Sequence, residues 1–200
     1  MRWSLLGPLI IEDEGCVLPV AGAKVRVVLA ALLLEPGRVV PADRLAEAVW
    51  GERQPKNPQS ALHNLVMRLR RSLGARATGN VRACQPGYVI DVDPSEVDVH
   101  AFADLCRACR DAHRAGDWTG CARLLRTALE LWRGDPLADV PAPMLAGRER
   151  LRLEELRLDA LGLRIDADLQ LGLGDELIAE LCDLTEEPGL AAIKTTLEDR

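Results

Sequence analysis

Short apolar runs and helical repeats alternate along the first half of the chain. Residues 3–6, 9–11 and 16–20 are β-type runs separated by turn residues, and they predict a small antiparallel sheet. Apolar residues at three- and four-residue steps then predict helices over residues 23–34 and 42–49. The first of these helices is apolar on almost every side, so we expect it to be buried.

A third helix is predicted over residues 57–73, with strong signals at both ends. Asn57 is a good N-cap, and Pro58 suits the first helical position, where no amide hydrogen is needed. Gly74 follows as a C-cap. One apolar stripe, which faces the core, consists of Leu62, Leu65, Val66, Leu69 and Leu73.

The opposite face of this helix carries candidate DNA-binding residues. At about 100° per residue, Ser60, Asn64, Met67 and Arg71 point outward, and His63, Arg68 and Arg70 flank them. No acidic residue occurs between residues 57 and 73. This order suits a helix that enters the major groove N-terminus first, with Asn64 reading adenine and the arginines reaching phosphates or guanine. The alternative is the solvated face of an ordinary amphipathic helix. For His63 a DNA contact and simple exposure both stay open, as do a thymine-methyl contact and packing for Met67.

Two further β-type runs follow, over residues 81–84 and 88–92, around the turn signal Gln85-Pro86-Gly87. A sheet, three helices and a final hairpin form the order of a winged helix-turn-helix, in which the hairpin is the wing. Arg82 is placed to touch a backbone phosphate beside this wing. A purely structural hairpin is the alternative.

The second half is predicted to be helical throughout. Apolar residues recur at helical steps over residues 97–115, 118–132, 148–171 and 176–184, with Gly- and Pro-containing breaks between them. The spacing around Gly116-Asp117-Trp118 is similar to that of a tetratricopeptide repeat (TPR). The whole chain is therefore expected to be mostly α with a small β component, an N-terminal winged helix-turn-helix followed by a TPR-like all-helical domain.

The net charge of the 200-residue chain changes sign where the predicted winged helix gives way to the all-helical half. Residues 1–93 hold 12 Lys and Arg against 9 Asp and Glu, a net charge of +3, whereas residues 94–200 hold 13 against 22, a net charge of −9. This asymmetry indicates two domains with different partners. No signal peptide or apolar run of about 18 residues is apparent, so we expect a cytoplasmic protein without a membrane partner.

The six cysteines are expected to be reduced thiols in such a protein. Cys106, Cys109, His113 and Cys121 have spacing that superficially fits a zinc site. However, Cys106 and Cys109 share an apolar stripe with Phe102, where a buried cysteine acts as a small hydrophobe, so we expect no metal. The sequence has no phosphate-binding loop and no catalytic motif. We therefore expect a protein that is not an enzyme and that binds no cofactor.

Six blocks in a fixed order carry a family resemblance: Leu5-Leu6-Gly7-Pro8-Leu9, Arg38-Val39-Val40, Asp43-Arg44-Leu45 with Val49-Trp50-Gly51, Arg68-Leu69-Arg70-Arg71 with Leu73, Pro86-Gly87-Tyr88, and Val97-Asp98 with Phe102. Over residues 1–185 the chain resembles the Streptomyces antibiotic regulatory proteins (SARPs). These transcriptional activators join an OmpR-type winged helix to a bacterial transcriptional activation domain (BTAD). The sequence departs from the family pattern at Pro41, where relatives often have Ser or Thr, and in its tail.

The resemblance implies a DNA-binding domain at 1–93, a shortened activation domain at 94–185 and an atypical tail at 186–200. It implies an activator of antibiotic or other secondary-metabolite genes, found in the cytoplasm and associated with the nucleoid. Two protomers, a homodimer on DNA, would bind direct repeats of double-stranded promoter DNA near the −35 element and recruit the RNA polymerase holoenzyme through its sigma factor. The alternative is a winged-helix and TPR-like protein-interaction module without specific promoter binding.

Overall fold

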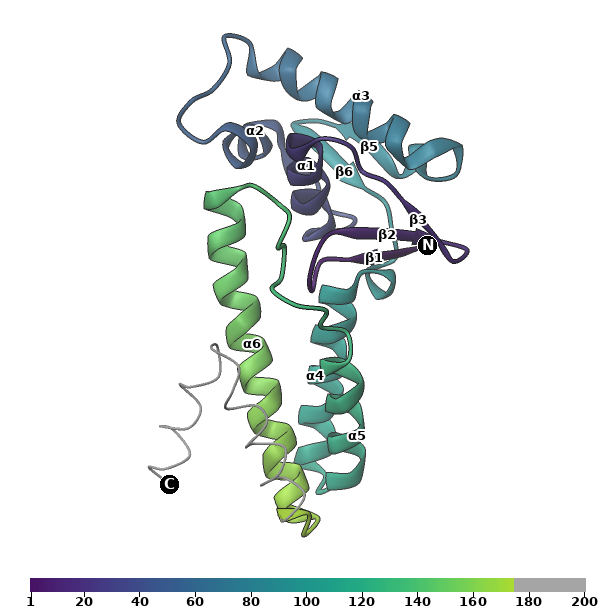
Figure 1. The fold of residues 1–200 in the computed structure, drawn as a ribbon, viewed down its shortest axis with the longest axis vertical. Coiled ribbons are helices and arrows are strands. Elements are labelled where there is room, and N and C mark those ends of the chain that lie inside the picture. The colour runs from purple at the N-terminus through teal and green to yellow at the C-terminus, as the bar shows by residue number, and fades with distance from the viewer. Residues whose placement is uncertain (175–200) are drawn as a thin grey trace. The chain divides into compact units, whose positions relative to one another are not determined.

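The computed structural model describes residues 1–174, with only the backbone of residues 75–78 and 143–146. It confirms a mostly helical chain with a small β component (Figure 1). The strands are β1 (Arg2–Ser4), β2 (Ile10–Asp13), β3 (Cys16–Leu18), β4 (Val40–Pro41), β5 (Val81–Cys84) and β6 (Gly87–Ile90). The helices are α1 (Ala23–Leu33), α2 (Ala42–Trp50), α3 (Pro58–Ala77), α4 (Asp98–Arg114), α5 (Trp118–Leu129) and α6 (Pro143–Gln170), with 3₁₀ turns at Thr78–Asn80 and Pro94–Glu96.

The described chain groups into two compact units. The first comprises residues 1–103 and 131–153, and the second comprises residues 104–130 and 154–174. The first unit thus extends past residue 93 and includes the segment between α5 and α6. The proposed domain boundary between residues 93 and 94 stays a prediction. The helix predicted over residues 176–184 and the tail at 186–200 lie outside the described residues.

In the first unit, the predicted N-terminal sheet forms as the antiparallel order β1-β2-β3, with Trp3 opposite Ile11 and Ile11 opposite Leu18. Helix α1 is buried on nearly all sides, as its composition predicts, and it packs against α2 and α3. The largest fully buried side chains of this unit are Trp3, Leu5, Leu6, Ile11, Leu29, Leu32, Leu33, Leu45, Leu62, Leu69, Ile90 and Phe102.

A second sheet has the antiparallel order β4-β6-β5, so the predicted hairpin forms and gains a third strand. Sequence reasoning missed β4, because a two-residue strand is too short to show alternation. The structure shows why residue 87 is a glycine: a β-carbon there would overlap the carbonyl oxygen of Val40. Only glycine allows β6 to approach β4 so closely.

A buried carboxylate ties the N-terminal segment to the start of α4. Asp98 is 6% exposed, and it accepts hydrogen bonds from the backbone N–H groups of Leu5 (2.7 Å) and Leu6 (2.9 Å). The guanidinium of Arg133 lies 3.6 Å from the same carboxylate. Since buried N–H groups need acceptors, Asp98 satisfies two donors that no strand partner reaches.

The segment between α5 and α6 holds residues 5–9 from another side. The backbone N–H groups of Arg133 and Leu137 donate to the carbonyl oxygens of Leu6 (2.7 Å) and Leu5 (2.9 Å). The Asp139 carboxylate accepts from the N–H of Leu9 at 2.7 Å. Residues 131–142 are therefore part of the fold that carries the N-terminal sheet.

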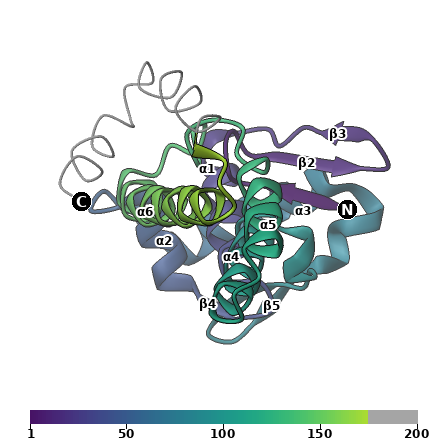
Figure 2. The ribbon, with the colours of Figure 1, turned by 90° about the horizontal axis from the view of Figure 1, so that it is seen from below.

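In the second unit, α5 lies beside the last turns of α4 (Figures 1 and 2). Asp117 caps α5 by accepting from the N–H of Gly120 at 2.8 Å. Asp168 of α6 is 1% exposed and forms an ion pair with Arg126 of α5, which links these two helices. Two predicted helix limits were wrong. Helix α5 ends at Leu129 instead of residue 132. Helix α6 begins at Pro143 instead of residue 148, because a proline is accepted in the first turn of a helix, where no amide hydrogen is needed.

Candidate nucleic-acid interface

The ends of α3 follow directly from the local sequence. The Asn57 side chain accepts from the N–H of Ser60 at 3.1 Å, which is an N-cap bond. At the other end Gly74 leaves helical geometry with φ 70°, a left-handed value that glycine adopts without a steric cost. The helix resumes as far as Ala77 beyond this kink, so the predicted end at Leu73 is the end of the straight part.

Packing decides which face of α3 is available to a ligand. The predicted apolar stripe is buried, and Leu62, Val66, Leu69 and Leu73 are each at most 2% exposed. The predicted outward residues lie on the exposed side together: Ser60, His63, Asn64, Arg68 and Arg71 are exposed and Met67 is half-buried. In this part of the described chain, neither Arg68 nor Arg71 has a carboxylate partner. Their positive charges are therefore available to an anionic ligand.

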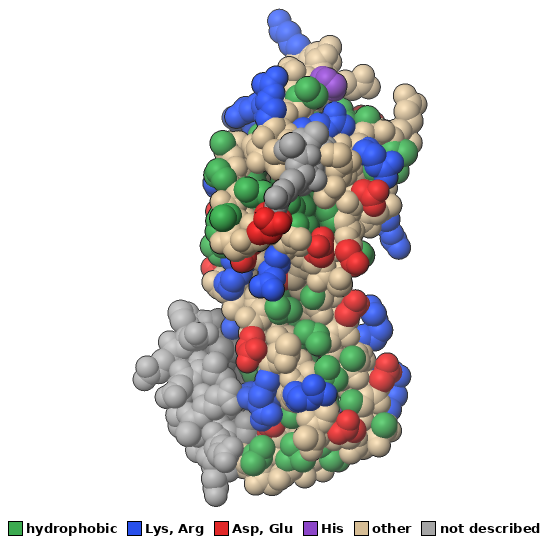
Figure 3. All heavy atoms as spheres, turned by 90° about the vertical axis from the view of Figure 1, so that its right-hand side faces the viewer, with side chains coloured by type: hydrophobic (Ala, Val, Ile, Leu, Met, Phe, Trp, Pro, Cys, Tyr) green, Lys and Arg blue, Asp and Glu red, His purple; other side chains and the backbone are tan. Residues whose placement is uncertain are grey.

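The surface charge agrees with this assignment. In Figure 3, the part of the first unit where Figure 1 shows α3 carries Lys, Arg and His side chains and few acidic ones. A net negative protein can present such a basic face to DNA because the electrostatic interaction is local at physiological salt.

Arg68 lies toward the start of α1. A β-carbon at Gly22 would lie 2.9 Å from Nη2 of Arg68, and Gly22 itself has a φ of 101°. Both the left-handed backbone and the close guanidinium favour glycine at this position. The arginine side chain is thus directed along the exposed edge between α3 and α1.

Two of the predicted site residues are placed differently from the others. Arg70 is half-buried, and its Nε donates to the carbonyl oxygen of Val81 in β5 at 2.9 Å. Arg82 is exposed on the hairpin, where its guanidinium lies 2.8 Å from the Asp91 carboxylate. The structure therefore groups six of the eight candidates on α3, turns Arg70 toward β5, and leaves Arg82 on the neighbouring hairpin.

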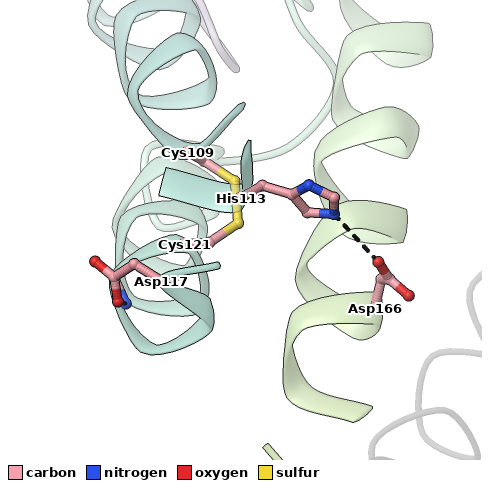
Figure 4. Close-up of a disulfide and its surroundings, with 6 residues drawn as sticks. Cys109, His113, Asp117, Cys121 and Asp166 are labelled. Carbon is pink, nitrogen blue, oxygen red and sulfur yellow. Dashed lines mark hydrogen bonds and ion pairs between the residues drawn. A yellow bond between two sulfur atoms is a disulfide. The ribbon is translucent and has the colours of Figure 1, made fainter. Parts of the chain in front are cut away.

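Two cysteines of the helical half differ from the expectation of reduced thiols. Cys109 of α4 and Cys121 of α5 form a disulfide, with their Cα atoms 4.4 Å apart (Figure 4). Closing a loop of this length stabilises a fold by about 3 kcal/mol in the chain-entropy account. Sequence reasoning missed the pair because the two cysteines lie on different helices.

The zinc alternative has no support in this geometry. His113 faces Asp166 of α6, 3.4 Å away, and not the sulfur atoms (Figure 4). Cys106 is buried, and burial raises the pKa of its thiol, which disfavours the thiolate that a metal would need. Residues 1–174 contain no cluster of three or more His, Cys, Asp or Glu side chains placed to hold a metal ion. None of the helices within these residues combines the length and the hydropathy that a membrane-spanning segment requires.

Two family models match the chain. The model described as "Transcriptional regulatory protein, C terminal" matches residues 21–90, and the model described as "Bacterial transcriptional activator domain" matches residues 97–190. The first match lies within residues 1–93 and the second within residues 94–200, the two halves that differ in predicted elements and in net charge.

The chain is similar to several proteins named as regulators. It is 38% identical over 193 residues to regulatory protein DnrI of Streptomyces peucetius, a match that covers 92% of this chain and 71% of DnrI. It is 37% identical over 186 residues to regulatory protein AfsR of Streptomyces coelicolor, which covers 92% of this chain but 18% of AfsR.

A solved structure of Mycobacterium tuberculosis EmbR, in complex with a low-affinity phosphopeptide, has a TM-score of 0.86 and 30% identity. This match covers 92% of this chain and 49% of the EmbR chain. The structural match, the two family models and the similarity to DnrI agree with one another, and the chain therefore belongs to the Streptomyces antibiotic regulatory protein family of transcriptional regulators.

Proposed function

We propose that this protein is a sequence-specific DNA-binding activator of a secondary-metabolite gene cluster. The observation that carries the proposal is the exposed, acid-free face of α3, which presents Asn64 together with Arg68 and Arg71. An amide side chain reads adenine in the major groove by two hydrogen bonds, and unpaired arginines bind phosphates or guanine. Residues 1–93 bind the DNA, with Ser60, His63, Met67 and Arg82 as further contacts.

The helical residues 94–185 support assembly on the promoter and contact with RNA polymerase holoenzyme through its sigma factor. Two protomers bind direct repeats near the −35 element, in the cytoplasm at the nucleoid. Direct repeats require a head-to-tail arrangement, because a two-fold symmetric pair would bind inverted repeats. The acidic charge of this half keeps it away from the DNA backbone and suits a basic protein surface.

Footprinting tests the proposal. The purified chain is mixed with upstream fragments of its neighbouring gene cluster over a series of salt concentrations. We expect protection of two repeats on one face of the DNA above a nonspecific background. Salt-sensitive binding without a footprint would contradict sequence specificity. A lack of binding at low salt would favour the protein-interaction module instead.

Replacing Arg71 with alanine is expected to weaken binding to all sequences alike. Loss of one phosphate contact makes the slope of log K against log salt shallower by about one unit. Fluorescence anisotropy with a labelled operator fragment measures this slope. Arg107→Ala is the matched control, because Arg107 is an exposed arginine of α4 paired with Asp104 and lies outside the interface. An unchanged slope in Arg71→Ala would refute the phosphate contact.

Replacing Asn64 with alanine is expected to act at one base pair. The loss of a bidentate contact costs about 1–3 kcal/mol at the cognate base and relaxes the preference there. Binding to a set of operators, each with one base pair changed, measures the preference at every position. Arg71→Ala serves as the contrast, since it should weaken all of these operators equally. Equal weakening by Asn64→Ala would contradict base reading by Asn64.

A further inference from the structure

Arg70 is the candidate DNA-binding residue whose side chain leaves the exposed face of α3. It is half-buried, between the core stripe and the outward face of the helix. Its Nε donates to the carbonyl oxygen of Val81 at 2.9 Å, a partly buried bond that joins α3 to the first residue of β5. A hydrogen bond with a charged donor is stronger than a neutral one, and partial burial protects it from water.

The acceptor is the carbonyl oxygen of Val81, the residue at which the hairpin begins. Val81 is 1% exposed and pairs with Ile90 of β6, so its backbone is held firmly by the sheet. The next residue is Arg82, whose exposed guanidinium is the proposed phosphate contact of the wing. A bond to the Val81 carbonyl therefore fixes where the hairpin, and with it Arg82, begins relative to α3.

The same guanidinium also reaches the exposed face of α3. Its Nη1 lies 3.8 Å from the sulfur of Met67, one of the proposed base-contacting residues. Methionine has three rotatable side-chain bonds and adopts many shapes unless a neighbour restrains it. Arg70 thus touches both parts of the interface through separate nitrogen atoms, which a planar guanidinium allows and a lysine ammonium does not.

We propose that Arg70 is a positioning residue that sets the placement of the β5–β6 hairpin against α3, so that Asn64 and Arg82 engage DNA together, and that it does not contact DNA itself. The joint engagement of DNA by Asn64 and Arg82 rests on the proposed function. The placement of the hairpin is a property of the free protein and is tested separately.

Hydrogen–deuterium exchange of the full chain without DNA tests the placement. Arg70→Ala is expected to raise exchange in the peptide covering residues 81–90 by about tenfold, because the hairpin loses its tie to α3. Arg71→Ala, an exposed arginine on the same helix, is the control and should leave this peptide unchanged. Circular dichroism confirms that both variants are folded at the temperature used. Unchanged exchange in Arg70→Ala overturns the proposal whether or not the protein binds DNA.

Operator binding then separates positioning from direct contact. Arg70→Lys retains the charge but replaces the three guanidinium nitrogens by a single ammonium, so positioning predicts that it binds weakly wherever it raises exchange in residues 81–90. Full affinity of Arg70→Lys together with raised exchange in residues 81–90 would instead assign a phosphate contact and overturn the proposal. In a double-mutant cycle, Arg82→Ala should weaken the wild type but add little to Arg70→Ala, since the hairpin is already displaced. Additive losses, with the salt slope shallower by about two units in the double variant, would also overturn it.

Discussion

Replacing Asp98 with alanine is expected to lower the free energy of unfolding by about 3 kcal/mol. The variant leaves the N–H groups of Leu5 and Leu6 buried without an acceptor, and each such donor costs about 1–3 kcal/mol. It also removes the carboxylate partner of Arg133. Urea unfolding followed by circular dichroism measures the loss.

Two variants sharpen this experiment. Asp104→Ala removes an exposed carboxylate from the same helix, where it pairs with Arg107, and should cost less than about 1 kcal/mol. Asp98→Asn retains one acceptor oxygen but turns an amide group toward the remaining donors, so its cost should lie between the two alanine variants. A loss in Asp98→Ala as small as that in Asp104→Ala would show that Asp98 does not hold the N-terminal segment.

The stability that Asp98 provides also depends on pH. Burial raises the pKa of Asp98 above its ordinary value of 3.8, although the Leu6 and Leu5 amides and Arg133 act in the lowering direction. The folded state therefore binds the proton more tightly than the unfolded chain does. This contribution is fully present below the ordinary pKa and is lost as the pH rises through the folded pKa. The stability of the wild type relative to Asp98→Asn should accordingly fall with rising pH from about 4 upward. A flat or rising difference would contradict the burial effect.

A chain that ends at Asp93 is expected to lack a cooperative folding transition. It loses the acceptor carboxylate of Asp98 and the bonds that Arg133, Leu137 and Asp139 make to residues 5–9. It also loses Phe102, which is wholly buried in the same unit and stacks edge-on against Trp132. Several kcal/mol are lost, against a total of about 5–15 kcal/mol for a typical domain.

Thermal unfolding and amide NMR dispersion of residues 1–93, with the full chain as the reference, measure this effect. We expect a broad transition and poor dispersion for the short chain. A sharp transition within a few degrees of the full chain would instead establish residues 1–93 as an independent domain, with the boundary where charge and element order suggest it.

The candidate interface was largely predictable because its signals are local. Asn57, Pro58 and Gly74 determine where α3 starts and where it bends through bonds and backbone angles within a few residues. The period of the apolar positions then assigns Asn64 and Arg71 to the outward side. The hairpin was predictable for the same reason, since its turn residues adjoin its strands.

What only the tertiary structure decided depends on partners distant in sequence. Asp98 and Leu5 are 93 residues apart, and nothing in the local pattern reveals that a carboxylate at a helix start will be needed as an acceptor there. Cys109 and Cys121 meet because α4 and α5 pack together. The sequence places Arg70 beside the outward arginines of α3, and only the fold brings the carbonyl oxygen of Val81 in β5 within hydrogen-bond distance of it. By itself the sequence determined the family, the order of most elements and the exposed face of α3, because periodicity and capping are local. The contacts of Asp98, residues 131–142 and Arg70 were decided by the tertiary structure, because a hydrogen bond needs the position of both partners.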